Sequence, residues 1–337
     1  MIFRDKTVII TGGSEGIGAA AARLFAEAGA NLVLVARNKK NLEALADELR
    51  DKTQVVIFPM DVTDPDACVD VFKKAAYEFG GVHILVNNAG YHARGDVADV
   101  DADELARIVD VNLRAPIMLS RIALKYFEEE SEAAIINVGS LAGRTPVPGS
   151  TTYSASKAGL RFFTLALADE LRDQPIKVGL VSPGPVSTGF ILEDIDATAD
   201  ITVSQPMSSA EEVAQAILDL CGNAQREVAM PRITGFLTTV TYLWPWIGRQ
   251  MRPVLLDRTH RQQSDIHFFD ARSGLAPGKL TPQVTVSAGW FQGVINLLFG
   301  RNGIEFKWKG RINSRVLEQI HFLPAVPPAR HRTVAMF

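Results

Sequence analysis

Short apolar runs alternate with longer amphipathic stretches over the first two thirds of the chain. The runs are rich in β-branched residues, and such runs are typical of strands that are buried on both faces of a parallel sheet. The predicted strands are Lys6–Thr11, Asn31–Ala36, Gln54–Pro59, His83–Val86, Ala133–Val138, Ile176–Val181 and Glu227–Pro231. Because a helical stretch separates most neighbouring strands, the pattern predicts an α/β fold with a doubly wound parallel sheet of about seven strands.

Polar residues mark the ends and interruptions of the predicted helices. Asp64-Pro65, and Ser209 with Glu212, are typical helix starts. A long helix is predicted over Asp101–Glu128, and Asn112 is mildly unfavourable inside it, which indicates a local reason for the amide. Residues 190–206 show no firm periodicity, as expected of a flap over a site.

A glycine-rich turn, Thr11-Gly12-Gly13-Ser14-Glu15-Gly16-Ile17-Gly18, follows the first predicted strand and leads into a helix closed by Gly29. Missing side chains let a pyrophosphate approach the backbone, and the helix N-terminus offers free N–H groups. The alternative, a flexible turn, fits the flanking strand and helix poorly. The turn therefore predicts a dinucleotide site.

The residues after the second and third strands bear on the choice of dinucleotide. In such folds an acidic residue after the second strand binds the ribose 2′-hydroxyl, whereas an arginine accommodates a 2′-phosphate. Arg37 stands there, so the sequence favours NADP(H) over NAD(H), although Glu15 opposes a phosphate and an ordinary solvated Arg37 is the alternative. Asp61 either accepts a hydrogen bond from the adenine or caps the next helix.

The stretch from Ser140 to Lys157 carries the candidate chemistry. Tyr153 and Lys157 are four residues apart, which places the phenol and the ammonium on one helix face. A neighbouring cation favours the phenolate and would lower the phenol pKa from about 10 toward neutrality. Ser140 could then hold a carbonyl oxygen while Tyr153 protonates it, provided that a reductant is bound elsewhere. A surface helix with a solvated lysine is the alternative for this spacing alone.

Composition places the protein in a broad class. The chain has 337 residues, of which 47% are hydrophobic and 22% charged, as in ordinary globular proteins. Cys68 and Cys221 lie far apart, and the start of the chain runs directly into a strand without room for a signal peptide. We therefore expect a cytoplasmic protein without a disulfide scaffold, and we expect no metal site.

Taken together, TGGSEGIG, NNAG (residues 87–90), Asn112, Ser140, YSASK and PGPVST closely resemble the short-chain dehydrogenase/reductase family in order and spacing. The resemblance covers residues 1–231 and implies a Rossmann fold with a nicotinamide cofactor as reductant. It implies that Tyr153 is the general acid/base, that Lys157 lowers its pKa and bonds the nicotinamide ribose, that Ser140 orients the carbonyl, and that Asn112 holds a relay water. Many members carry a second serine where this chain has Gly139, which leaves the catalytic hydroxyl in place.

The expected cofactor-binding residues are Thr11, Gly12, Ser14, Gly16, Ile17, Gly18, Arg37, Asp61, Val62, Asn88, Ala89, Gly90, Tyr153, Lys157, Pro183, Gly184, Val186 and Thr188. In the resemblance Gly12, Gly16 and Gly18 surround the pyrophosphate, and Thr188 takes the carboxamide. We therefore expect an NADPH-dependent reductase of a lipophilic ketone, or the reverse dehydrogenase. A weaker likeness to 3-ketosphinganine reductases suggests a 3-keto lipid. The alternative is a non-catalytic, membrane-associated NADP-binding scaffold, and by family analogy we expect a homodimer or homotetramer.

The extension over residues 232–337 differs in composition from the rest. The net charge of −3 divides into −12 over residues 1–225 and +9 over residues 226–337, and all four tryptophans lie in the basic part. Uncharged aromatic segments between residues 235 and 300 are flanked by cations, as in peripheral membrane anchors, but are too polar for a confident membrane span. Covering the substrate cleft or a subunit interface is an equal alternative. Residues 301–310 resemble a hairpin, residues 324–337 are expected to be disordered, and no motif supports nucleic-acid binding.

Overall fold

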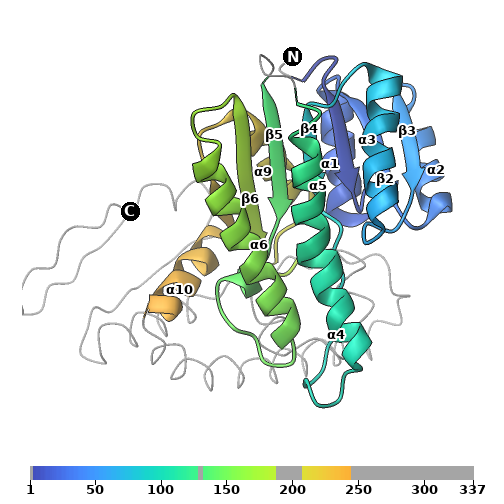
Figure 1. Ribbon diagram of the computed structural model, residues 1–337. Helices are drawn as coiled ribbons and strands as arrows, with labels where there is room; N and C mark the ends of the chain where they lie inside the picture. Colours follow the sequence, from blue (N-terminus) through green and yellow to red (C-terminus); the bar gives the residue numbers. More distant parts are fainter. Residues whose placement is uncertain (1–2, 128–131, 187–206, 244–337) are drawn as a thin grey trace, which may run out of the picture. The chain divides into compact units, whose positions relative to one another are not determined.

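The computed structural model describes residues 3–127, 132–186 and 207–243, in which strands alternate with helices (Figure 1). The strands are β1 (Thr7–Thr11), β2 (Asn31–Ala36), β3 (Val55–Pro59), β4 (Ile84–Asn87), β5 (Ala133–Val138), β6 (Ile176–Pro183) and β7 (Glu227–Met230). The helices are α1 (Gly16–Glu27), α2 (Lys39–Leu49), α3 (Pro65–Phe79), α4 (Ala102–Val109), α5 (Ala115–Ala123), α6 (Thr151–Glu170), α9 (Ala210–Gly222) and α10 (Arg232–Leu243). A π-helical turn η1 (Asp110–Arg114) and a 3₁₀ turn η2 (Leu141–Gly143) complete the set.

The seven strands form one parallel sheet in the order β3-β2-β1-β4-β5-β6-β7. The predicted seven-stranded, doubly wound sheet is therefore confirmed, and the strand ends agree with the apolar runs to within two residues. The order of the strands reverses between β1 and β4. In open parallel sheets a ligand binds at this reversal, beyond the carboxyl ends of the strands.

Each strand contributes alternate residues to two hydrophobic layers. Val8 and Ile10 of β1 pack with α1, α2 and α9, whereas Ile9 packs with α3, α5 and α6. In Figure 1 the helices α3, α5 and α6 cover the face of the sheet toward the viewer. Both faces of the inner strands, β2, β1, β4, β5 and β6, are largely buried, which explains why their runs are continuously apolar rather than alternating.

Four buried polar side chains form a ladder between the sheet and its helices. Asn87 Nδ2 donates to Asn137 Oδ1 at 2.8 Å and to Ser120 Oγ at 3.3 Å, and Asn137 Nδ2 donates to Thr164 Oγ1 at 2.8 Å. The four residues come from β4, β5, α5 and α6, and none is more than 2% exposed. The ladder joins α5 and α6 to the sheet, and the side-chain amide nitrogens of Asn87 and Asn137 both have acceptors.

The long helical stretch predicted over Asp101–Glu128 is confirmed from Ala102 to Ala123, but it is not one regular α-helix. Helices α4 and α5 are separated by η1, and α5 ends at Ala123. Asn112 lies in this wider turn, and its side chain bonds the backbone of Tyr91 outside the helix. A π-helical turn at such a residue is common near functional sites. The amide that is unfavourable in a regular helix thus makes contacts that the helix cannot provide.

The predicted helix starts are confirmed. Asp64 accepts hydrogen bonds from two backbone N–H groups at the start of α3, and Ser209 and Glu212 form a complete capping box on α9. Asp61 is therefore not the cap, and the alternative that gave it this role is wrong. Gly29 follows α1 with a left-handed φ of 85°, as expected for a glycine that ends a helix.

Several predicted segments lie outside the described residues: the flap over residues 190–206, the hairpin over residues 301–310, the disordered end and most of the extension that begins at residue 232. Within the extension, α10 packs against β7. Among the described helices, none has the length and apolar character needed to cross a membrane. The division between the catalytic domain and the extension stays a prediction.

Candidate active site

The glycine turn between β1 and α1 closes against its own backbone. Gly12 and Gly16 have left-handed φ angles of 62° and 53°. A Cβ atom on Gly18 would lie 2.1 Å from the Gly12 carbonyl oxygen, and one on Gly12 would lie 2.8 Å from Asn88 Nδ2. Side chains are therefore excluded at Gly12 and Gly18. Glu15 precedes α1, and its side chain accepts no capping hydrogen bond from the first turn of the helix. The backbone N–H groups at this helix N-terminus are therefore suited to bind an anion.

Thr11 and Asn88 tie this turn to the end of β4. Thr11 Oγ1 accepts from the backbone N–H groups of Asn88 (3.0 Å) and Ala89 (3.1 Å) and donates to the Val86 carbonyl (3.3 Å). Asn88 Nδ2 donates to the carbonyls of Thr11 and Gly12, each at 3.0 Å. The structure thus brings the predicted residues Thr11, Gly12, Asn88 and Ala89 together as one bonded unit.

Arg37 and Asp61 lie at the ends of β2 and β3, where the sequence placed the adenosine side. Arg37 is exposed, and its charge acts on Asp61. Burial raises the pKa of Asp61, but hydrogen bonds from Thr63 and the charges of Arg107 and Arg37 outweigh it and lower that pKa. Arg107 Nη2 of α4 lies 3.6 Å from Asp61 Oδ2. Both arginines therefore favour an ionised Asp61 at neutral pH.

Arg107 was missed by the sequence reasoning. Its guanidinium lies over the ring of Tyr91, with 5.2 Å between the guanidinium carbon and the ring centroid. The Tyr91 hydroxyl in turn bonds Glu104. No local signal marks Arg107, because it reaches the ends of β3 and β4 from a distant helix.

Asn112 joins the residue after NNAG to α6. Its Oδ1 accepts from the Tyr91 N–H and its Nδ2 donates to the Tyr91 carbonyl, both at 2.8 Å. The same Nδ2 lies 3.3 Å from Ser156 Oγ. Asn112 is fully buried, and a Cβ atom on Gly90 would lie 3.6 Å from its Oδ1. The predicted residues Gly90 and Asn112 are thus neighbours.

The structure brings Ser140, Tyr153 and Lys157 together at the carboxyl end of β5. Ser140 follows this strand, and its side chain forms a hydrogen bond with Tyr153. Lys157 stands one turn after Tyr153 in α6 and is only 4% exposed. Its Nζ donates to the Val138 carbonyl at 2.8 Å and lies 5.8 Å from the centroid of the Tyr153 ring. The helical spacing predicted from the sequence therefore produces the expected cluster.

The phenol pKa, however, shifts in the direction opposite to the expectation. Burial raises the pKa of Tyr153, and the Ser140 hydrogen bond and the charge of Arg94 offset this only in part. Burial also lowers the pKa of Lys157 to about 8. Desolvation is the largest cause for both groups, of which Lys157 is buried and Tyr153 is partly buried. In this structure Tyr153 accordingly holds its proton at neutral pH.

His92 is a second site residue that sequence reasoning missed. Its ring stacks on the ring of Tyr153, with centroids 4.2 Å apart and an interplanar angle of 27°. Burial, followed by the charges of Arg94 and Lys157, lowers the pKa of His92 to about 4, so the imidazole is neutral at physiological pH. Its position two residues after NNAG could have drawn attention to it, but nothing in the sequence predicts the stacking.

The remaining predicted cofactor residues surround the same edge of the sheet. Val62 is buried after β3, while Ser14 and Ile17 lie partly exposed around the start of α1. Pro183 ends β6, the Gly184 N–H bonds the Met230 carbonyl, and Val186 is buried. Thr188 lies outside the described residues. At Gly139 a Cβ atom would lie 3.0 Å from Leu180 Cδ1, so a serine would be tightly packed there.

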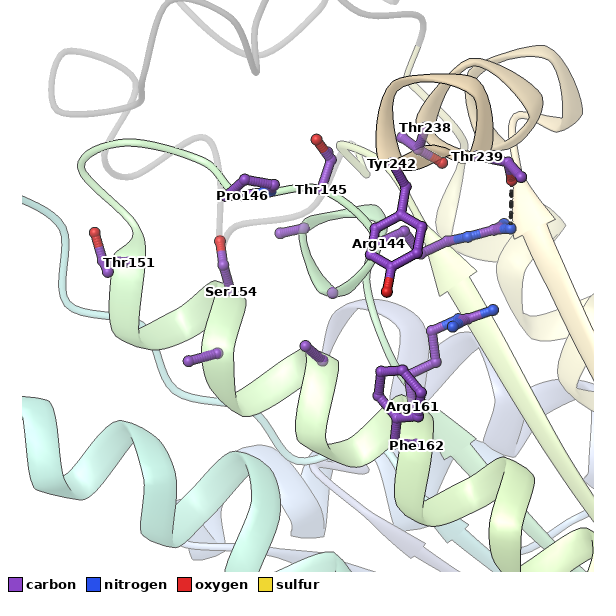
Figure 2. A pocket seen from close by; sticks show the side chains of 14 residues that line it. Arg144, Thr145, Pro146, Thr151, Ser154, Arg161, Phe162, Thr238, Thr239 and Tyr242 are labelled. Atoms are coloured by element: carbon purple, nitrogen blue, oxygen red, sulfur yellow. Dashed lines mark hydrogen bonds between the residues drawn. The ribbon is translucent and has the colours of Figure 1, made fainter. Parts of the chain in front are cut away.

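A cavity of about 380 Å³ lies between α6, the segment after η2 and α10 (Figure 2). Arg144, Ser154, Arg161 and Tyr242 are among its lining residues. Among the described residues that line it, Ser140, Tyr153 and Lys157 do not occur. The cavity is thus lined by neighbours of the catalytic candidates along the chain, and not by the candidates themselves.

Comparisons with known proteins agree with this arrangement. The sequence model described as short chain dehydrogenase matches residues 6–198. Dehydrogenase/reductase SDR family member 7B of Rattus norvegicus is 32% identical over 275 residues, which are 77% of this chain and 83% of that protein. An uncharacterized oxidoreductase of Staphylococcus aureus (strain MRSA252) is 35% identical over 218 residues, which are 64% of this chain and 91% of the relative.

Solved structures show the same likeness. A short chain dehydrogenase from Burkholderia cenocepacia J2315 in complex with NADP superposes with a TM-score of 0.62 and 30% identity, covering 67% of this chain and 96% of that one. A short chain dehydrogenase from Bacillus anthracis str. 'Ames Ancestor' gives a TM-score of 0.59 and 27% identity, covering 67% and 95%.

Proposed function

The chain belongs to the short-chain dehydrogenase family, an oxidoreductase family, and we propose that it reduces a ketone of a lipophilic substrate with NADPH. The observation that carries the proposal is the cluster of Ser140, Tyr153 and Lys157 at the carboxyl end of β5. This edge of a doubly wound sheet is where ligands bind. The glycine turn fits a dinucleotide, because the positions where a Cβ atom would clash are those that let a pyrophosphate reach the backbone.

In the proposed mechanism NADPH, when bound, would provide the hydride that reduces the carbonyl carbon. Ser140 holds the carbonyl oxygen, and the Tyr153 hydroxyl donates its proton to that oxygen as negative charge develops there. The hydrogen bond with Ser140 supports this role, because it lowers the pKa of Tyr153 against the effect of burial and so makes the phenol a better proton donor. Lys157 bonds the nicotinamide ribose and keeps positive charge near the phenol, and Asn112 holds a water that returns protons from solvent.

The remaining cofactor roles follow the same proposal. Gly12, Gly16 and Gly18 surround the pyrophosphate, Asp61 and Asn88 face the adenosine side, and Thr188 takes the carboxamide. The other proposed cofactor contacts are Thr11, Ser14, Ile17, Val62, Ala89, Gly90, Pro183, Gly184 and Val186. Apolar side chains exposed on α4 and α5, namely Val109 and Ile117, support a homodimer or homotetramer.

Changing Tyr153 to Phe tests the chemistry. The variant should lose turnover against a panel of ketones while binding NADPH with unchanged affinity, because only the proton donor is removed. Stopped assays of NADPH oxidation and a fluorescence titration of NADPH measure the two properties. Near-normal turnover in Tyr153→Phe would contradict the mechanism. Absence of turnover in the wild type with every ketone, with NADPH still bound, would favour the non-catalytic NADP-binding scaffold instead.

Arg37 carries the proposed preference for NADP(H). An arginine after β2 can pair with a 2′-phosphate, and a solved relative with the same fold is a complex with NADP. Changing Arg37 to Ala should weaken NADPH binding by about tenfold or more, as expected for a charge-assisted contact, and should leave NADH binding unchanged. Arg50→Ala at the other end of α2 is the matched control. An equal effect on both cofactors would show that Arg37 does not recognise the 2′-phosphate.

The substrate class is also part of the proposal. The uncharged aromatic segments after residue 232 support a lipophilic substrate, such as a 3-keto lipid, and contact with a membrane surface through residues 235–300. Co-sedimentation with lipid vesicles, compared between the full chain and a chain that ends at residue 243, measures that contact. Equal binding by both chains would exclude residues 244–300 as the anchor.

A further inference from the structure

Two arginines line one end of the apolar cavity described above. Figure 2 shows the side chains of Arg144 and Arg161 together, with the hydroxyls of Thr151 and Ser154 toward the other end. The side chain of Arg144 is 15% exposed and that of Arg161 is 24% exposed. Both charges are therefore largely shielded from solvent. A cation in such surroundings is stabilised by a neighbouring anion.

The described residues offer these two cations a single carboxylate. Arg161 donates from Nε and Nη2 to Glu227 at 2.8–3.1 Å, and Ser182 Oγ donates to the same carboxylate at 3.1 Å. Arg144 Nε lies 3.7 Å from Glu227 Oε1, beyond a good hydrogen bond. Counted over the described part of the chain, the group of Arg144, Arg161 and Glu227 thus carries one excess positive charge.

Arg144 has most of its hydrogen-bonding capacity left for a ligand. Its hydrogen bond within the described residues runs from Nη2 to Thr239 Oγ1 at 2.8 Å (Figure 2). A guanidinium carries five N–H donors and can bind a carboxylate with two parallel hydrogen bonds. Burial and the charge of Arg161 lower the pKa of Arg144 against the opposing charge of Glu227, which agrees with an incompletely compensated cation.

The remaining wall of the cavity is mainly apolar, although the hydroxyl-bearing residues Thr145, Thr151, Ser154, Thr238 and Thr239 also line it. Ala142, Pro146, Ala155, Ala158 and Phe162 line it, together with the ring of Tyr242 from α10. Its volume of about 380 Å³ falls within the range of about 300–1,000 Å³ that small-molecule sites occupy. An apolar wall with one excess cation matches a ligand that has a hydrocarbon chain and a single anionic group.

We propose that this cavity binds an amphiphilic carboxylate, such as a medium-chain fatty acid, with the carboxylate on Arg144 and the chain along the outer face of α6. The site is distinct from Ser140, Tyr153 and Lys157, so it does not depend on the proposed reductase activity. The ligand bridges α6 and α10 through Arg144, which already bonds Thr239 of α10.

Calorimetric titration of the full chain with octanoate and with 1-octanol tests the proposal. Octanoate should bind more tightly than 1-octanol, because only octanoate can pair with Arg144. Arg144→Met should weaken octanoate binding by about tenfold or more and leave 1-octanol unchanged, since it removes a charge-assisted contact but keeps the length of the side chain.

Three further variants test whether octanoate binds in this cavity. Ala155→Leu adds bulk at an exposed helical position that lines the cavity, so it should weaken both ligands alike. Arg172→Met removes an exposed arginine that pairs only with the adjacent Asp173 among the described residues, and should change neither. Tyr153→Phe should bind octanoate normally. Equal binding of octanoate and 1-octanol, no binding to the wild type, an unaffected Arg144→Met variant, or loss of octanoate binding in Tyr153→Phe would each overturn the proposal.

Discussion

Changing Thr11 to Val should destabilise the turn that joins β1 to β4. Valine keeps the shape of threonine, but the backbone N–H groups of Asn88 and Ala89 lose their acceptor. Each unpaired donor costs about 1–3 kcal/mol, and the lower half of that range applies because both residues are partly exposed. Two donors give about 2–4 kcal/mol, and an additional buried methyl group returns about 1 kcal/mol. The expected loss in the free energy of unfolding is therefore about 1–3 kcal/mol.

Thr7 provides a matched control in the same strand. It is fully buried like Thr11, but its Oγ1 has no hydrogen-bond partner within the described residues. Thr7→Val removes no hydrogen bond and adds a buried methyl group, so it should stabilise the protein by up to about 1 kcal/mol. Urea unfolding of the full chain measures both variants, and a titration with NADPH should show weaker binding only for Thr11→Val. A similar stability change in both variants would refute the reasoning.

Two further predictions concern the turn and the buried lysine. Gly18→Ala should weaken NADPH binding by about fivefold or more in a fluorescence titration, because its Cβ atom meets the Gly12 carbonyl oxygen at 2.1 Å and overpacking costs about 1–3 kcal/mol. Apart from its chain neighbours and the nearby helix backbone, Gly222→Ala places its new Cβ atom more than 4 Å from any atom of the described residues, so it should leave NADPH binding unchanged and should not lower the stability of the fold. Equal losses of NADPH affinity in the two variants would contradict the role of the clash. The pKa of Lys157 is about 8 in the folded chain, below its unfolded value of about 10.4, so the unfolded chain binds more protons between these values and stability should rise with pH there. The wild type should gain about 3 kcal/mol relative to Lys157→Met from pH 8 to 10.5 in urea unfolding, and parallel pH curves for the two proteins would exclude the shift.

The strands were predictable because a buried strand requires apolar residues at consecutive positions of the sequence. The runs around Ile9, Val33 and Ile135 are apolar throughout, and a residue that is buried on either face of a sheet must be apolar whichever way it points. The spacing of Tyr153 and Lys157 was equally readable, since a regular helix converts four residues into one turn.

Contacts between distant segments could not be predicted in this way. Asn112 in η1 bonds the backbone of Tyr91, and the ring of His92 in a loop stacks on that of Tyr153 in a helix 61 positions later. The direction of the Tyr153 pKa also depends on burial, which neighbouring residues in the chain do not reveal. Local patterns therefore identified the groups of the site but not the environment that sets their protonation.

The ladder through Asn87, Asn137 and Thr164 limits how the interior can diversify. An apolar residue at any one of these positions would remove a partner from a neighbour that is itself sealed from water, so single replacements are penalised. Replacing Asn87 and Asn137 together removes both amide groups at once, leaves neither without the other, and so reduces that penalty. Among relatives, the residues at these positions should therefore change together. A relative in which only one of them has changed should hold its helices in a different position against the sheet.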